Sequence, residues 1–158
     1  VTIYLSPRDY HRVHAPLDAQ VMGYRYIPGV LQPVSPAFVS TVPELFARNE
    51  RVVFHLKTSV GPVAVVMVGA TGVGNISVTY AGAGAQAVES RHFRSEGRIR
   101  SEFHHEPVPI ERGQELGVFQ LGSTVVMVLP RGAALGPDDG ASLRVGQPIG
   151  RLPAEDGA

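Results

Sequence analysis

Two apolar runs on either side of a short turn constrain the fold of this chain more than any other feature. In residues 52–57, Val52, Phe54 and Leu56 alternate with more polar neighbours, which predicts a half-buried strand. Residues 63–68 are apolar on both faces, which predicts a strand in the middle of a sheet. The sequence Ser-Val-Gly-Pro at 59–62 is a turn signal between them. The two runs therefore predict neighbouring antiparallel strands.

The same pattern recurs along the chain, whereas helix signals are few. Further strands are predicted at 1–5, 76–80, 115–119, 123–129 and 147–152, and the strands at 52–57, 63–68 and 76–80 should form an antiparallel meander. A short helix should follow Thr41 as its cap, carry Leu45 and Phe46, and end near Asn49. Ser6–Asp9 should form a second helical turn. The polar residues 82–109 predict a long solvated excursion.

Composition removes several classes of function. Lys and Arg number 14, as do Asp and Glu, so no net charge attracts nucleic acid. The absence of cysteine excludes disulfides, thiolate catalysis and thiolate metal sites. No apolar run approaches the roughly 18 residues of a membrane-spanning helix, and no signal peptide opens the sequence. Because the chain starts without Met in a strand-like run, we expect an N-terminally truncated or excised chain.

Several polar patterns have an ordinary interpretation that competes with a functional one. His11 and His14 could be unremarkable histidines, since a zinc site would need a third ligand and the pair His104–His105 lies in the polar segment. The glycines of 69–74 lack dinucleotide spacing and predict a bend between strands. The arginines of 91–100 could grip phosphate, but interleaved glutamates favour a solvated loop. The apolar residues 27–31 predict either core or a loop that contacts lipid.

The sequence Leu121-Gly122-Ser123-Thr124 carries the most chemical information. A Gly-spaced hairpin pattern precedes it and the apolar run 125–129 follows it, so Ser123 should stand at the mouth of a strand. The Gly122 carbonyl before it has no Cβ to hinder an attack. This is the geometry with which a chain can cut itself and convert the serine into a cofactor.

Five motifs in a fixed order resemble those of phosphatidylserine decarboxylases, from about Tyr4 to Pro148. The first is the histidine motif Ser-Pro-Arg-Asp-Tyr-His-Arg-Val-His-Ala-Pro at 6–16. The others are Tyr-x-Pro-Gly-x-Leu at 26–31, Phe-Ala-Arg-Asn-Glu-Arg at 46–51, Val-Gly-Ala-Thr-x-Val-Gly at 68–74, and the segment 113–124 that ends in Leu-Gly-Ser-Thr. With all five in order, the two histidines fit catalytic roles better than ordinary ones.

The resemblance implies an activity and a role for each matching residue. The chain would cut itself between Gly122 and Ser123 into a β chain, 1–122, and an α chain, 123–158, with a pyruvoyl group formed from Ser123. That cofactor would form a Schiff base with phosphatidylserine and release CO2 to give phosphatidylethanolamine. His14 would be the base for Ser123 and His11 would act in decarboxylation. The resemblance places the aspartate that orients the base before Val1, so it also allows an intact Gly122–Ser123 bond in this chain.

The resemblance also implies a fold, partners and a location. We expect a mainly β single domain, 1–158, with antiparallel sheets, a few short helices and a likeness to barrel-sandwich hybrids. The implied partners are the lipid substrate, a membrane surface and a second copy of the chain. The implied location is peripheral, on the cytoplasmic face of a bacterial cell membrane, with no metal and no nucleic acid. Two alternatives remain open: a non-catalytic, unprocessed binding or scaffold domain, and a hydrolase that uses Ser123 and His14.

Overall fold

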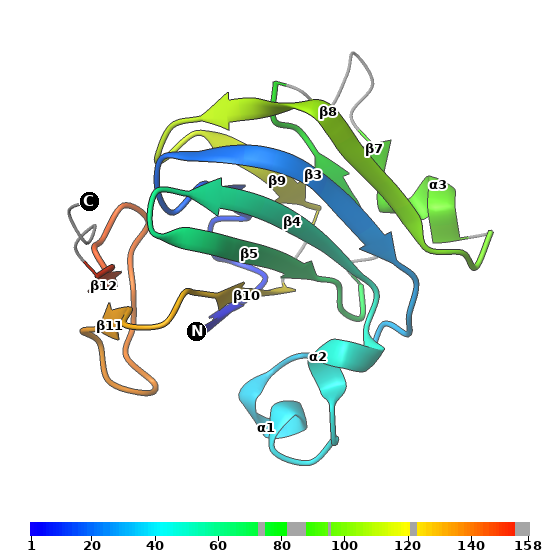
Figure 1. Ribbon diagram of the computed structural model, residues 1–158. Coiled ribbons are helices and arrows are strands. Elements are labelled where there is room, and N and C mark those ends of the chain that lie inside the picture. Colours follow the sequence, from blue (N-terminus) through cyan, green and yellow to red (C-terminus); the bar gives the residue numbers. More distant parts are fainter. Residues whose placement is uncertain (73–74, 82–87, 95, 121–122, 154–158) are drawn as a thin grey trace.

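The computed structural model describes residues 1–72, 75–81, 88–94, 96–120 and 123–153 (Figure 1). Strands make up 46% of the described residues and helices 9%, which confirms the predicted mainly β fold. The sheets are antiparallel, and within this part of the chain they do not close into a barrel. The described ranges also contain three short helices outside the sheets: α1 (Pro36–Val39), α2 (Leu45–Arg48) and α3 (Ser90–Arg94).

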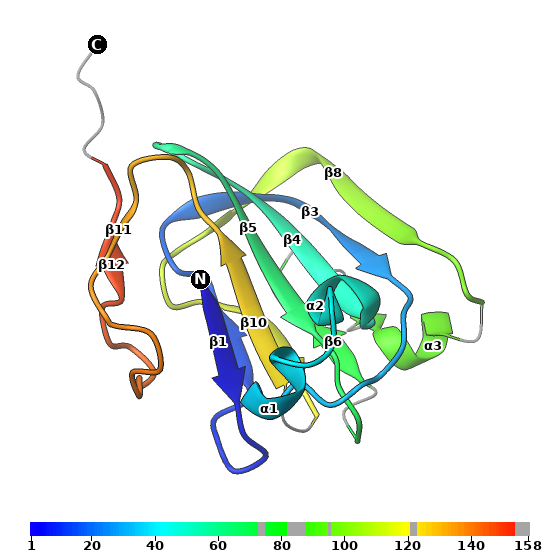
Figure 2. The same cartoon turned by 90° about the horizontal axis from the view of Figure 1, so that it is seen from below.

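Two sheets form the body of the domain, and a small ribbon accompanies them (Figures 1 and 2). The larger sheet has the strand order β1 (Thr2–Leu5), β10 (Ser123–Val128), β5 (Gly61–Val68), β4 (Arg51–Thr58), β3 (Ala19–Ile27), β8 (Arg100–Ile110). The smaller sheet has the order β2 (Arg12–His14), β9 (Glu115–Phe119), β6 (Ile76–Val78), β7 (Val88–Glu89). The ribbon pairs β11 (Ala134–Leu135) with β12 (Gly150–Arg151).

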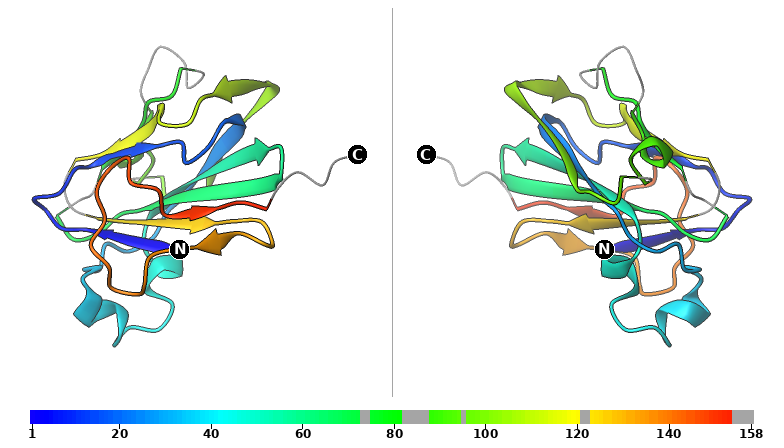
Figure 3. Two further views of the ribbon diagram at one scale, coloured as in Figure 1. Left: turned by 90° about the vertical axis from the view of Figure 1, so that its left-hand side faces the viewer. Right: turned by 90° about the vertical axis from the view of Figure 1, so that its right-hand side faces the viewer.

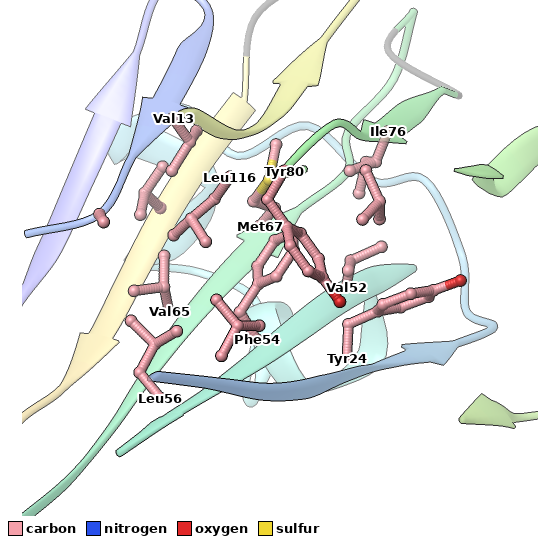
Figure 4. Packing of buried hydrophobic residues seen from close by; sticks show 14 of the residues in the cluster. Val13, Tyr24, Val52, Phe54, Leu56, Val65, Met67, Ile76, Tyr80 and Leu116 are labelled. Carbon is pink, nitrogen blue, oxygen red and sulfur yellow. The ribbon is translucent and has the colours of Figure 1, made fainter. Parts of the chain in front are cut away.

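One hydrophobic core lies between the two sheets (Figure 4). The alternation in 52–57 is confirmed, because Val52, Phe54 and Leu56 are at most 2% exposed. Residues from the smaller sheet, among them Ile76 and Leu116, complete the same cluster. Each sheet therefore buries the face that its period-2 pattern makes apolar.

A glycine allows close approach at the centre of this core. A Cβ built on Gly117 of β9 would lie 2.7 Å from the carbonyl oxygen of Ser77 and 2.9 Å from the sulfur of Met67. Both distances are too short for a side-chain carbon. Gly117 is therefore required for β9 to pack against β6 and β5.

Several predicted elements are confirmed and others are wrong. The strands at 52–57, 63–68, 115–119 and 123–129 are present, and β5 lies inside the larger sheet as expected. β6 ends at Val78 and belongs to the smaller sheet, so the three-strand meander is wrong. Of 147–152, only β12 is strand. The strand β3 was not predicted, because it contains Gly23 and lacks a clean alternation.

The prediction of a solvated loop at 82–109 is wrong where the structure forms a helix or a strand, in β7, α3 and β8. β8 is an 11-residue strand that pairs with β3, and α3 packs next to β6 and β7. The charged pattern of β8 fits an edge strand with most side chains in solvent, a pattern that resembles a loop in sequence. Residues 82–87 lie outside the described part of the chain.

The helix predicted after Thr41 begins later than expected. α2 starts at Leu45, and Glu44 stands at its N-cap with φ 55° and no side-chain cap bond. The Thr41 hydroxyl instead donates to the carbonyls of Ala37 and Phe38, at the end of α1. Residues 6–9 form a single turn rather than a helix, closed by the Asp9 amide on the Ser6 carbonyl.

Candidate active site

Two chain segments connect the larger sheet to the smaller one side by side: the segment from Leu5 to Arg12, which contains most of the histidine motif, and the segment from Phe119 to Ser123. We call this place the strand crossing. β1 pairs with β10 in the larger sheet, with Leu5 opposite Ser123. β2 pairs with β9 in the smaller sheet, and the Phe119 amide donates to the His11 carbonyl at 3.0 Å. Both segments therefore pass from one sheet to the other at the same place, and His11 and Ser123 stand on either side of it. Leu121 and Gly122 lie outside the described residues.

Ser123 occupies the first position of β10 and is completely buried. It lies on the same face of the strand as Val125 and Met127, both of which belong to the core. Its hydroxyl has no hydrogen-bond partner in the described structure. Leaving a buried hydroxyl unpaired costs about 1–3 kcal/mol, so such a group calls for a functional explanation.

His14 is held by both ring nitrogens in a defined tautomer. Its Nδ1 lies 2.8 Å from the Gly113 carbonyl oxygen, and its Nε2 lies 2.8 Å from the Tyr10 hydroxyl. A carbonyl can only accept, so Nδ1 carries a proton, and in the neutral ring Nε2 accepts from Tyr10. The Tyr10 and His14 rings also stack, with centroids 5.6 Å apart. The lone pair that a general base needs is therefore directed to Tyr10 and not to Ser123.

His11 directly precedes β2, and its Nε2 differs from that of His14. Its Nδ1 lies 2.5 Å from the Asp9 carbonyl oxygen, so this nitrogen carries the proton. Its Nε2 is buried and, among the described residues, has no partner. His11 and Ser123 thus contribute two buried polar atoms, next to one strand crossing, that have no partner in the described part of the chain.

One ion pair, Arg12 with Glu115, lies next to His14 on the smaller sheet. Glu115 stands opposite His14 in the β2–β9 ladder and accepts from Thr79 and Arg12, each at 2.6 Å. Burial raises the pKa of Glu115, but the hydrogen bonds from Thr79 and Arg12 outweigh it and the pKa lies below its usual value. Glu115 therefore stays ionised and engaged, and the Gly113 carbonyl, not a carboxylate, fixes the His14 ring.

A buried carboxylate connects α3 to the larger sheet. Glu50 is fully buried and accepts from Arg94 at 2.6 and 2.9 Å, from Ser90 at 2.9 Å and from Tyr26 at 3.1 Å. The hydrogen bond to Glu50 raises the pKa of Arg94. Burial, followed by the charge of Glu50, raises the pKa of Tyr26.

This buried carboxylate is joined to the strand crossing through Asn75. Ser90 accepts from the Ile76 amide at 2.9 Å, and the adjacent Asn75 carbonyl accepts from the Gln120 amide at 3.2 Å. Gln120 is the last described residue before Ser123. The position of Gln120 therefore depends in part on Glu50.

The structure brings together some of the predicted site residues and separates others. It places His11 and Ser123 beside one strand crossing and His14 at the other end of β2, opposite Glu115, and among the described residues it makes no hydrogen bond between Ser123 and either histidine. Sequence reasoning missed Tyr10 and Gly113, although both lie inside motifs that had been recognised. It also missed the Glu50–Arg94 pair, because the glutamate and arginine come from segments far apart in the chain.

The described residues give little support for a metal site. No three His, Asp or Glu side chains within them come close enough to hold an ion. His104, which was considered as a third zinc ligand, instead contacts the Tyr80 hydroxyl at 2.5 Å. None of the helices in the described part of the chain has the length and hydropathy needed to cross a membrane.

Comparisons with known proteins agree on one family. The family model for phosphatidylserine decarboxylase matches residues 1–151. The phosphatidylserine decarboxylase proenzyme of Anaeromyxobacter sp. (strain K) is 45% identical over 154 residues, which cover 94% of this chain and 52% of the relative. The proenzyme of Legionella pneumophila (strain Corby) is 42% identical over 152 residues, with the same two coverages. The proenzyme of Halorhodospira halophila is 45% identical over 159 residues, which cover 99% of this chain and 52% of the relative. The chain spans about half the length of these curated relatives.

Proposed function

The chain belongs to the phosphatidylserine decarboxylase family, and we propose that it carries the residues with which a self-processed protein decarboxylates phosphatidylserine. One observation supports this most directly. The Ser123 hydroxyl is fully buried and without a partner among the described residues, at the start of a strand that pairs beside the histidine motif. A structural serine at this position would be expected to bond to its surroundings.

The first proposed step is cleavage of the chain by its own serine. Ser123 Oγ attacks the Gly122 carbonyl carbon, the C–N bond breaks, and the amide becomes an ester. Loss of the Ser123 α proton then expels the glycine carboxylate and leaves dehydroalanine. Water hydrolyses this to ammonia and an N-terminal pyruvoyl group. A base must accept the hydroxyl proton, and His14 is the proposed base because its Nε2 is the nitrogen without a proton.

The proposed step requires a change at His14. Its Nε2 accepts from Tyr10, so that bond must break before the nitrogen can take a proton from Ser123. The bond from Nδ1 to Gly113 can persist and would keep the ring in the tautomer that a base needs. Release of the Tyr10 bond is therefore part of the proposed step.

The residues present fit the pyruvoyl group that the family implies. The group would occupy the place of Ser123, inside the core-facing side of β10, where water is excluded. When formed, it would supply an electron sink for loss of CO2. The unpaired His11 Nε2 is the proposed site that, once protonated, donates to the substrate carboxylate or returns its proton after CO2 has left.

The hydrolase alternative fits the geometry less well. A hydrolase needs a base that is already bonded to its serine. The Nε2 of His14 accepts from Tyr10 instead, and the Ser123 hydroxyl has no partner among the described residues. The unprocessed scaffold remains an outcome of the experiment below. Attachment to a membrane surface and a homodimer are part of the proposal.

Intact-mass spectrometry of the purified chain and of Ser123→Ala tests the proposal. We expect two fragments divided after Gly122, the smaller one with a pyruvoyl mass and a blocked N-terminus, and no cleavage in the variant. The same cut in Ser123→Ala would refute the mechanism. An intact wild-type chain labelled at Ser123 by a fluorophosphonate would favour the hydrolase, and an intact unlabelled chain would favour the scaffold.

A further inference from the structure

The excursion between β3 and β4 carries an apolar tip, defined here as residues 27–43. No charged side chain occurs in this segment. Its helix α1 consists of Pro, Ala, Phe and Val, yet none of these residues is buried. Phe38 is 42% exposed and Val39 is 40% exposed. A short helix of this composition would normally pack its apolar side against the core, so its exposure indicates a contact outside the chain.

The apolar tip is rigidly mounted. Asn49 is fully buried, and its side-chain amide donates to the carbonyls of Gln32 and Gly69 at 2.9 Å each. The Glu50 amide donates to the Val30 carbonyl at 2.9 Å. Val34 of the tip packs in a separate small cluster with Leu45 and Ala70. The segments on both sides of α1 are therefore held by buried contacts, which fix the position of its exposed side chains.

The tip stands at the same end of the larger sheet as Ser123. In the ladder, Thr124 pairs with Val68, Val68 with Arg51, and Arg51 with Ile27, where the tip begins. Ile27 is thus three strand spacings, about 14 Å, from the residue next to Ser123. Figures 2 and 3 show α1 on the same side of the molecule as the loop that follows β1 and carries His11.

Charged residues near the tip suit an anionic surface. Arg48 ends α2 and Arg8 lies in the loop after β1; both are exposed, and neither has an ion-pair partner in the described part of the chain. Arg51 also lies at this end, where its guanidinium donates to the carbonyls of Ala47 and Asn49. Glu44, which follows the tip, and Asp9, next to Arg8, are also exposed and offset part of this charge. The three arginines still exceed these two carboxylates, and an uncharged apolar tip beside a small excess of positive charge suits an interface with an anionic bilayer.

We propose that the apolar tip docks this domain on a lipid bilayer, with Phe38 and Val39 inserted and the strand crossing at Ser123 turned toward the membrane. This inference rests on the proposed function, which makes a lipid the substrate. It assigns the contact to α1 rather than to residues 27–31, whose backbone is held by main-chain bonds from Val30 to Arg48 and Glu50 and by a bond from the Thr71 hydroxyl to the Leu31 carbonyl.

A single fluorophore can test this surface, because the chain contains no tryptophan. In a Ser123→Ala background, which cannot mature, Phe38→Trp should shift its emission to the blue when phosphatidylcholine–phosphatidylserine vesicles are added. Brominated lipid should quench it. The matched control is Val145→Trp, at a site 69% exposed in the C-terminal segment, which should respond to neither. Equal responses at both positions, or none at 38, would overturn the proposal.

Vesicle sedimentation gives the energetic test. In the same background, Phe38→Ser with Val39→Ser should weaken partitioning at least about tenfold, since burial of one such side chain is worth a factor of this size. Leu135→Ser with Val145→Ser removes exposed apolar surface elsewhere and should not weaken it. A concentration-dependent blue shift of Phe38→Trp without vesicles would instead identify a second copy of the chain as the occupant and refute docking on lipid.

The two proposals can fail separately. Vesicle docking in the Ser123→Ala chain does not depend on cleavage or on CO2 release. Docking without maturation of the wild-type chain would refute the proposed function alone. Maturation and CO2 release without docking through Phe38 would refute this inference alone.

Discussion

Replacement of Arg94 by Met should destabilise the domain far more than the loss of an ordinary surface ion pair. Arg94 contributes two of the four hydrogen bonds that Glu50 accepts, and Glu50 is fully buried. Met has a similar length and keeps the aliphatic contacts, so the change removes mainly the charge. The carboxylate would then be left inside the protein without a cation in contact with it.

The expected size follows from the burial of each partner. Removing one member of a buried ion pair costs about 3–5 kcal/mol, because the other charge stays behind unpaired. We use the lower limit, about 3 kcal/mol, because the Arg94 side chain is 36% exposed and because Ser90 and Tyr26 still donate to the carboxylate. For a domain of this length, that loss lowers Tm by about 6–12 °C.

Urea unfolding of Arg94→Met beside Arg100→Met provides the measurement and its control. Arg100 pairs with Glu96 at i,i+4, with side chains that are 52% and 38% exposed, so its loss should cost only about 0.3–0.5 kcal/mol. If both variants lose the same small amount, the buried carboxylate is not the anchor inferred here. A loss of cleavage in Arg94→Met at a temperature where it is folded would further link α3 to the segment before Ser123.

Three further predictions concern the core and the site. Gly117→Ala should cost about 1–3 kcal/mol in urea unfolding through overpacking, whereas Gly136→Ala, with open space around its Cβ, should be neutral; equal effects would contradict the close approach. Burial, with a smaller contribution from a neighbouring carboxylate, raises the pKa of Tyr80 to about 12. The unfolded chain then loses this proton first, so stability should fall as pH rises from about 10 to about 12, and Tyr80→Phe should reduce that slope. Nitrogen NMR should show His14 protonated at Nδ1, and Tyr10→Phe should shift the Nε2 resonance far more than Nδ1; an Nε2–H tautomer would refute the assignment.

The sequence predicted the strands that have a clean pattern and missed those that lack one. Alternation over 52–57 and the apolar run 63–68 identify β4 and β5, because one or both faces of these strands are buried. β8 is an edge strand whose charged side chains mostly face solvent, so its pattern does not differ from that of a polar loop. No local pattern could assign β6 to the other sheet, since that placement depends on pairing with β9.

The candidate site also combines residues that local motifs indicate with contacts that only the fold creates. Motif order pointed to Ser123, His11 and His14, and the structure places His11 and Ser123 beside one strand crossing with His14 at the other end of β2. The state of those residues depends on contacts across the chain: Gly113 fixes the His14 tautomer from 99 positions away, and Glu50 meets Arg94 across 44. Sequence spacing therefore indicated which residues matter, whereas the three-dimensional fold was needed to show which atoms are free to react.

The strand crossing gives a physical reason for the proposed cleavage to follow folding. The histidine motif and Ser123 belong to one site only when β1 pairs with β10 and β2 pairs with β9, and both ladders join segments that are far apart in the sequence. An unfolded or partly folded chain would hold the serine and its proposed base far apart. Even in the folded chain, the bond from Tyr10 keeps the base from the serine until it breaks. Maturation would then require two successive events, completion of the ladders and release of His14, and only the second can occur without unfolding the domain.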